Sequence, residues 1–168
     1  MKQEYSSAKT SIKQIPAGFN IIDKYFGWEY GTFNFDIGGG KYDLMSEALL
    51  KKTIINVIYD PYNRTPEFNE NSLAVVRTFK ASTVTIFNVL NVIKERENQI
   101  EVLNLAHEVL KPGGKVFVRS TYMNPAKVSG VTKSGTFQHY LKQKDYLEIV
   151  KIVFPNAQLK YGIIFATN

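Results

Sequence analysis

The chain has 168 residues, 44% of them hydrophobic and 13% aromatic, which is enough to bury the core of one compact domain spanning 1–168. It has no cysteine, which excludes disulfides, cysteine-ligated zinc and thiol catalysis, and its two histidines, His107 and His139, exclude a three-histidine metal site. The formal net charge of +6 points to an anionic partner rather than a cationic one.

Segment 1–14 is polar and rich in lysine, so we expect a polar N-terminal arm that is either mobile or docked. Apolar residues at helical spacing predict a helix over Pro16–Tyr25, and an aromatic run predicts a strand over Thr32–Ile37. A second helix is expected over Tyr42–Lys52, followed by a strand over Thr53–Tyr59.

Two prolines predict a loop over 60–66, and a helix should then run from Asn69 or Asn71 to Thr78. The next strand is hard to find. Only Phe79–Ser82 is available for it, so we expect it to be very short or absent. A clear strand pattern resumes over Thr83–Asn88.

A long helix is predicted over Glu95–Leu110, and Pro112 and the two glycines after it indicate a stop and a turn before a strand at Lys115–Arg119. Segment 120–142 reads as a long loop, and we expect it to be an active-site loop because loops of this length usually cover binding sites. The last expected elements are a helix at Asp145–Phe154 and strands at Ala157–Tyr161 and Ile163–Thr167.

Strands alternate with helices along the whole chain. This order predicts an α/β fold with a Rossmann-like, doubly wound and mostly parallel sheet, with helices on both faces. The last two strands are joined almost directly at Gly162, so they pair antiparallel if they are neighbours.

The most informative motif is a buried strand that ends in Asp36 and continues through Gly38, Gly39 and Gly40 into a helix. Glycines let a backbone turn sharply and approach a ligand closely. Asp60 closes the next strand, where an acid can accept hydrogen bonds from ribose hydroxyls. Taken alone, a glycine-rich turn also occurs without any ligand, and Asp60 before Pro61 could be a simple turn acid.

In succession, Asp36–Gly40, Asp60, the strand end at Val84–Asn91 and the run Leu110–Val118 resemble the motifs of class I S-adenosylmethionine (SAM)-dependent methyltransferases. The run Leu-Lys-Pro-Gly-Gly at 110–114 is similar to that family's turn into its fifth strand. The resemblance implies a seven-stranded sheet whose last strand is antiparallel. It also implies a cofactor, SAM, with S-adenosylhomocysteine (SAH) as product, at the carboxyl ends of the first, second and fourth strands.

Carried over by position, the resemblance places eight residues at the cofactor. Asp36 and the glycines would line its methionine side, Asp60 its ribose, and Asn88 and its neighbour the transferred methyl group. The full set is Asp36, Gly38, Gly39, Gly40, Asp60, Pro61, Asn88 and Val89.

No strong general base stands out, and we expect no metal site. The weak candidates for a catalytic role are Asn88, Tyr122 and His139, for which turn formation, aromatic packing or surface exposure is the commoner explanation. The sequence Asn88-Val89-Leu90-Asn91 lacks the paired prolines of DNA amino-methyltransferases. Two other functions stay open. One is a non-catalytic SAM-fold module that binds nucleic acid or a protein. The other is a nucleotide-linked oxidoreductase, although the glycine motif for binding a dinucleotide requires a third glycine where this chain has Asp43.

The positive charge is concentrated toward the C-terminus. Residues 111–168 carry nine Lys or Arg against two acids, whereas residues 1–110 are nearly neutral. This predicts an anionic acceptor, such as nucleic acid, near the C-terminal part, with a solvated basic surface as the alternative. Neither a membrane-spanning run nor a signal peptide is evident, and together with the lack of cysteine this favours a cytoplasmic protein.

Overall fold

The computed structural model describes residues 3–120 and 127–168. Its strands are β1 (Phe33–Ile37), β2 (Ile55–Tyr59), β3 (Ala81–Phe87), β4 (Leu110–Arg119), β5 (Gly130–Val131), β6 (Phe137–Gln138), β7 (Gln158–Lys160) and β8 (Ile163–Thr167). Its helices are α1 (Ala17–Tyr25), α2 (Leu44–Leu50), α3 (Pro66–Phe79), the 3₁₀ turn η1 (Leu90–Val92), α4 (Arg96–Val109) and α5 (Gln143–Val153).

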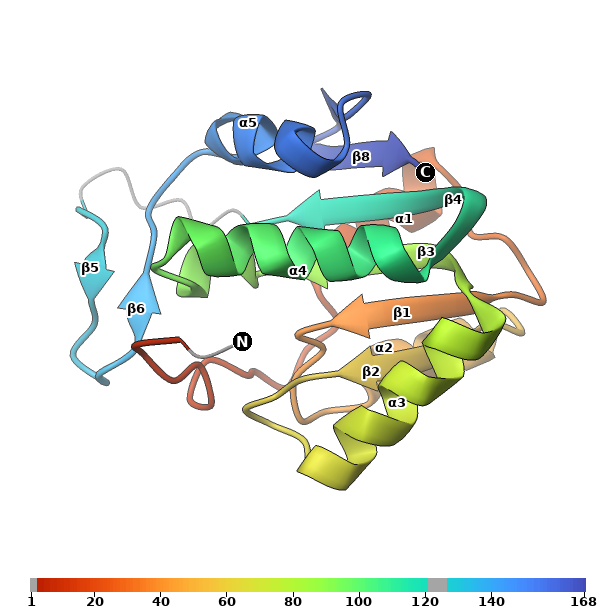
Figure 1. Cartoon of the computed structure of the whole chain (residues 1–168), viewed down its shortest axis with the longest axis horizontal. Coiled ribbons are helices and arrows are strands. Elements are labelled where there is room, and N and C mark those ends of the chain that lie inside the picture. The colour runs from red at the N-terminus through yellow and green to blue at the C-terminus, as the bar shows by residue number, and fades with distance from the viewer. Residues whose placement is uncertain (1–2, 121–126) are drawn as a thin grey trace.

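The central sheet has the strand order β2-β1-β3-β4-β8-β7 (Figure 1). Strands β2, β1, β3 and β4 are parallel, and β8 pairs antiparallel with both β4 and β7. The predicted fold class, a mostly parallel sheet with an antiparallel C-terminal strand, is therefore confirmed. The carboxyl ends of the four parallel strands meet at one edge, where ligands bind in open α/β sheets.

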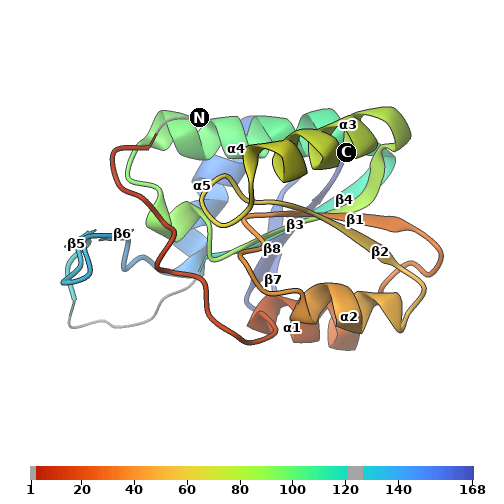
Figure 2. The ribbon, with the colours of Figure 1, turned by 90° about the horizontal axis from the view of Figure 1, so that it is seen from below.

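Helices cover both faces of this sheet (Figure 2). Helices α1 and α2 lie on one face, over a core that includes Phe19, Leu49 and Phe117. Helices α3, α4 and α5 lie on the other face, over a larger core that includes Leu103 and Tyr146. Strand β3 runs between the two layers and is buried along its whole length, as a central parallel strand must be.

The sheet has six strands in the described part of the chain, not the seven that the family resemblance implied. Helix α3 leads directly into β3 through Lys80, whose φ is +53°. Segment 79–82 therefore supplies no strand of its own. Its last two residues instead begin β3, because Ala81 already pairs with Leu110 of β4.

Two other boundaries differ from the expected ones. Helix α3 begins at Pro66 rather than at Asn69 or Asn71, because the Thr65 hydroxyl accepts a hydrogen bond from the Phe68 amide and proline fits the first helical turn. Strand β4 begins at Leu110, and Pro112–Gly114 form an irregularity within it rather than a turn ahead of it. A side chain at Gly114 would lie only 2.9 Å from the carbonyl oxygen of Lys111.

Segment 120–142, expected to be a loop, contains the two-stranded hairpin β5–β6. The hairpin stands beyond the carboxyl ends of the parallel strands and contacts η1 (Figure 1). The Tyr5 ring of the N-terminal arm lies 6.0 Å from the Phe137 ring of β6, centroid to centroid. The described part of the expected active-site loop therefore contains regular structure, a short hairpin that lies beside the carboxyl ends of the strands.

Candidate functional site

A hollow lies at the carboxyl ends of β1, β2 and β3. The glycine loop after β1 forms one side of it, and the loop after β2 forms another. The turn after β3 supplies a third side, and the N-terminal arm crosses the edge of the sheet here (Figure 2). The lining residues include Asp36, Gly38, Gly39, Gly40, Asp60, Pro61, Tyr62, Asn63, Asn88, Val89, Ser11 and Ile12.

The glycine loop has no room for side chains. Gly38 and Gly40 adopt φ values of +73° and +72°, a region that favours glycine. A Cβ on Gly38 would overlap Cγ2 of Val89, and one on Gly39 would lie 2.5 Å from Oδ2 of Asp36. The three glycines therefore allow the backbone to pass directly over the ends of the neighbouring strands.

Asp60 is buried and organises the loop that follows β2. Its Oδ1 accepts hydrogen bonds from the amides of Tyr62 and Asn63, both at 2.9 Å. Its Oδ2 accepts one from the Gly40 amide at 2.9 Å, which ties the two loops together. The side-chain amide of Asn63 lies 3.2 Å from each carboxylate oxygen, the longest of these contacts.

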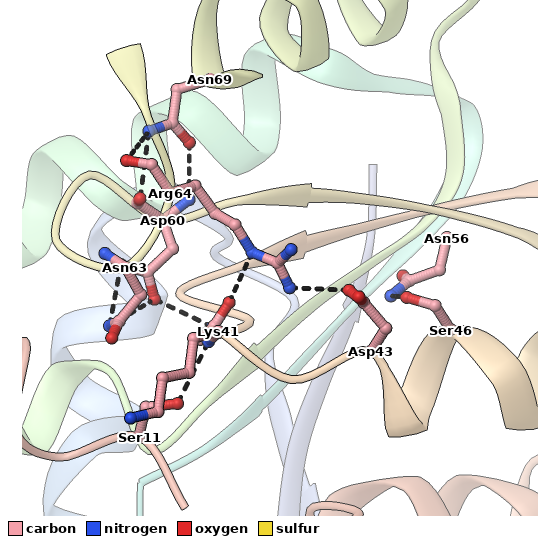
Figure 3. Close-up of polar contacts among 10 residues, drawn as sticks. Ser11, Lys41, Asp43, Ser46, Asn56, Asp60, Asn63, Arg64 and Asn69 are labelled. Carbon is pink, nitrogen blue, oxygen red and sulfur yellow. Dashed lines mark hydrogen bonds and ion pairs between the residues drawn. The ribbon is translucent and has the colours of Figure 1, made fainter. Parts of the chain in front are cut away.

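Three more side chains hold the same loops (Figure 3). The Asn69 side chain pairs with the Asp60 backbone, accepting from its amide at 2.8 Å and donating to its carbonyl at 3.0 Å. Arg64 donates from Nε to the Gly40 carbonyl at 2.8 Å and from Nη2 to Asp43 at 2.7 Å. Ser11 of the arm accepts from the Lys41 amide at 3.1 Å.

Asp36 lies beneath the glycine loop, 3% exposed. Burial raises the pKa of its carboxyl group from 3.8 to about 7, although a hydrogen bond donated by Thr85 at 2.8 Å lowers it. The Asp60 carboxylate raises this pKa further. The two acids that end the neighbouring strands are therefore close enough to interact electrostatically, and one of them is poised to take up a proton near neutral pH.

On the β3 and β4 side, the backbone turns sharply at Asn88, whose φ is +57° and whose amide donates to the Arg119 carbonyl at 2.7 Å. Beside it, Nε of Arg119 and Oγ of Ser120 are buried with no hydrogen-bond partner in the described part of the chain. Burial lowers the pKa of the Arg119 guanidinium. Neither Arg119 nor Ser120 is among the residues that line the hollow, so these two atoms lie next to the Asn88 turn rather than on the surface of the hollow.

All eight residues expected at the cofactor line this one hollow. Of the acceptor candidates, Asn88 also lines it, and Tyr122 lies outside the described residues. His139 is not among the described residues that line the hollow. Its ring packs edge-on against Phe137 at 4.7 Å, and burial lowers its pKa. A role of these three residues in transfer remains a prediction.

Sequence reasoning missed the residues that brace the site. The side chain of Asn63 donates to the Asp60 carboxylate, and those of Arg64 and Asn69 donate to backbone carbonyls. These contacts depend on the folded geometry of the loops, which cannot be predicted from the spacing of residues in the sequence. The available signal was the presence of Asn63 and Arg64 within four residues of Asp60, in the same loop. The arm residue Ser11 gave no signal, since its partner Lys41 is 30 positions away in the chain.

Groups of three or more His, Cys, Asp or Glu suited to a metal ion do not occur in residues 3–120 and 127–168. In the same residues, none of the helices has the length and apolarity needed to cross a membrane.

Many solved structures share this architecture. A Burkholderia thailandensis 1,6-didemethyltoxoflavin-N1-methyltransferase matches with a TM-score of 0.64 at 12% identity, over 90% of this chain and 76% of its own. A SAM-dependent methyltransferase from Methanosarcina mazei matches with a TM-score of 0.62 at 12% identity, over 93% and 97% of the two chains. A T. thermophilus 16S rRNA methyltransferase matches at 0.56 and 17% identity, over 95% of this chain.

The chain spans 44% of that rRNA enzyme and 54% of the pyocyanin biosynthetic protein PhzM, another structure with this fold. No protein-family model matches the sequence. No curated protein matches it either. The fold is that of the class I SAM-dependent methyltransferases, and at these identities the structural likeness establishes the fold alone.

Proposed function

We propose that this protein is a SAM-dependent methyltransferase. The observation that carries the proposal is the convergence of a side-chain-free glycine loop, the strand-ending Asp60 and the Asn88–Val89 turn around one hollow. These three features follow three different strands. A glycine loop allows close approach of a ligand, and a strand-ending acid can accept hydrogen bonds from the hydroxyls of a ribose.

The residues present fit this cofactor. A Cβ at Gly38 or Gly39 would collide with Val89 or Asp36, so only glycine allows the loop the close packing seen beside the hollow. Oδ2 of Asp60 has one short contact, to the Gly40 amide, and its second contact is the longer one to Asn63. A ribose hydroxyl can donate to this oxygen by taking the place of the Asn63 amide, because a carboxylate oxygen accepts about two hydrogen bonds.

SAM supplies an electrophilic methyl group, so the chemistry does not demand a strong base from the protein. The glycine loop and Asp60 would hold the ligand, and the Asp36 carboxyl group, whose pKa is about 7, would favour a cationic ligand when it is ionised. The turn at Asn88 and Val89 limits where an acceptor can approach. Alignment and exclusion of water are the main contributions that this site can make.

The acceptor is proposed to be anionic. The support is the Arg119 guanidinium at the end of β4, whose Nε has no partner among the described residues, and the positive charge of residues 111–168. Guanidinium groups pair readily with phosphate and carboxylate groups. Nucleic acid is one acceptor of this class, and a small anionic metabolite is another.

The test is incubation of the protein with methyl-labelled SAM and separate pools of RNA, DNA, protein and small metabolites. We expect label in one pool, and less of it when Arg119→Gln replaces the wild type. Binding of SAH without transfer to any pool would instead support the non-catalytic module. Failure of the wild type to bind SAM or SAH at all would overturn the proposal.

A further inference from the structure

Three successive backbone groups of the glycine loop are each held by a side chain from another segment. Asp60 accepts from the Gly40 amide at 2.9 Å, Arg64 donates to the Gly40 carbonyl at 2.8 Å, and Ser11 accepts from the Lys41 amide at 3.1 Å. The peptide plane between Gly40 and Lys41 is therefore fixed from both sides. Glycine costs more conformational entropy to order than other residues, so this loop needs such external restraint.

Arg64 is the restraint that reaches furthest. Its side chain is 14% exposed, and its fork spans the Gly40 carbonyl and the Asp43 carboxylate at the start of α2. The ring of Phe68 lies 5.1 Å below the guanidinium and limits its movement. A planar guanidinium can make both contacts at once, whereas a lysine ammonium cannot present two donors in this geometry.

The fork also explains an unusual helix start. Asp43 precedes α2 but makes no side-chain capping hydrogen bond to that helix. Its carboxylate instead pairs with Arg64 at 2.7 Å (Figure 3). An acid that would ordinarily stabilise the helix thus serves to anchor an arginine over the glycine loop.

We propose that Arg64 is a positioning residue that holds the glycine loop in its ligand-binding conformation, an inference that rests on the proposed function. The cofactor then meets a loop that is already ordered, and the entropy of ordering it is not subtracted from the binding free energy. Loss of Arg64 weakens cofactor binding without removing any atom that touches the cofactor.

The test compares Arg64→Gln with wild type by calorimetric titration of SAH and by hydrogen exchange of the ligand-free protein. We expect the SAH dissociation constant to rise about tenfold, which corresponds to losing one charge-assisted hydrogen bond. We expect the amides of Gly40 and Lys41 to exchange at least about fivefold faster. Asp43→Asn, which leaves the contact to Gly40 intact, should give a smaller rise of about threefold.

Arg77→Gln is the matched control, because Arg77 makes the same kind of Nε contact, to Glu108 at 2.8 Å, on an exposed surface. It should leave both measurements unchanged. Wild-type SAH affinity and wild-type exchange in Arg64→Gln would overturn the inference. If wild type itself binds no SAH, the proposed function fails, and the exchange rates alone still decide whether Arg64 fixes the loop. Should Arg64→Gln not fold, Asp43→Asn carries the same comparison.

Discussion

The two sides of the hollow are held together by different chemistry. At the ends of β1 and β2, charged groups make most of the contacts: Asp60, Arg64 and Asp43 bind backbone amides, a carbonyl and one another. At the ends of β3 and β4, neutral amides do this work, with Gln99 donating to the Leu90 carbonyl at 2.7 Å and Gln143 to the Val118 carbonyl at 2.6 Å.

This difference indicates a division of labour. The charged side fixes the glycine loop through several hydrogen bonds, and under the proposed function this loop would bind a cofactor in one fixed way. On the neutral side, Nε of Arg119 is buried and has no hydrogen-bond partner in the described residues. Under the proposed function the acceptor would approach from this side, and the solved structures that share this fold include enzymes named for quite different acceptors.

The largest expected effect concerns the buried charge of Asp36. Its pKa is raised from 3.8 to about 7, so the folded state binds this proton more tightly than the unfolded state. The free energy of unfolding should therefore fall as pH rises through this interval. Asp36→Asn removes that fall, and its stability relative to wild type should increase by up to ~4 kcal/mol between the two pH values.

Urea denaturation of both proteins at several pH values measures this difference. Asp145→Asn, at the exposed start of α5, serves as a carboxylate control. A stability difference between Asp36→Asn and wild type that does not change with pH would show that folding does not raise the pKa of Asp36.

Asp60→Ala should be nearly as severe. It leaves the amides of Gly40, Tyr62 and Asn63 without their acceptor, and we expect about 3 kcal/mol less stability and the loss of measurable SAH binding. Asp23→Ala is the control, because Asp23 pairs with Lys52 at the surface. If Asp60→Ala were as stable as this control, the hydrogen bonds of Asp60 would not stabilise the loops that follow β1 and β2.

Gly38→Ala tests the close approach of the glycine loop. We expect about 2 kcal/mol of destabilisation, partly from the positive φ and partly from contact with Val89. Gly31→Ala separates the two causes, since Gly31 has φ +70° but no atom within 4 Å of its Cβ position. If thermal unfolding shows that the two variants lose the same stability, the added methyl group at Gly38 does not clash with Val89.

The smallest effect is expected from the arm. Ser11→Ala removes one acceptor from the Lys41 amide and should raise the SAH dissociation constant about threefold, with little change in stability. Ser6→Ala, near the start of the same arm, should leave titration results as in wild type. An unchanged SAH dissociation constant in Ser11→Ala would show that the contact between the arm and the glycine loop does not contribute to cofactor binding.

Much of the fold follows from the sequence because its signals are local. The strands that end at Ile37 and Tyr59 and the helix over 96–109 each show a hydrophobic pattern of the right period. The sequence did not predict that α3 would lead directly into β3. Whether another strand lies between them depends on how α3 packs on the sheet, and the local pattern does not show this. The hairpin β5–β6 is equally inaccessible, because its strands are two residues each and carry no pattern.

The candidate site divides in the same way. Asp36, the glycines and Asp60 stand at the ends of predictable strands, so their convergence follows from parallel pairing. Arg64 and Asn69 bind backbone groups whose positions exist only in the folded loops. The arm crosses the edge of the sheet through contacts with partners as far as 91 positions away, and no local signal reports such pairs.

The most direct measurement for the whole account is the titration of wild-type protein with SAH, followed by NMR of the backbone amides. The account predicts binding of one molecule per chain, with the largest shifts at Gly38–Lys41 and Tyr62–Asn63 and small shifts in α5. No heat of binding, or shifts confined to residues far from the carboxyl ends of β1 and β2, would contradict it.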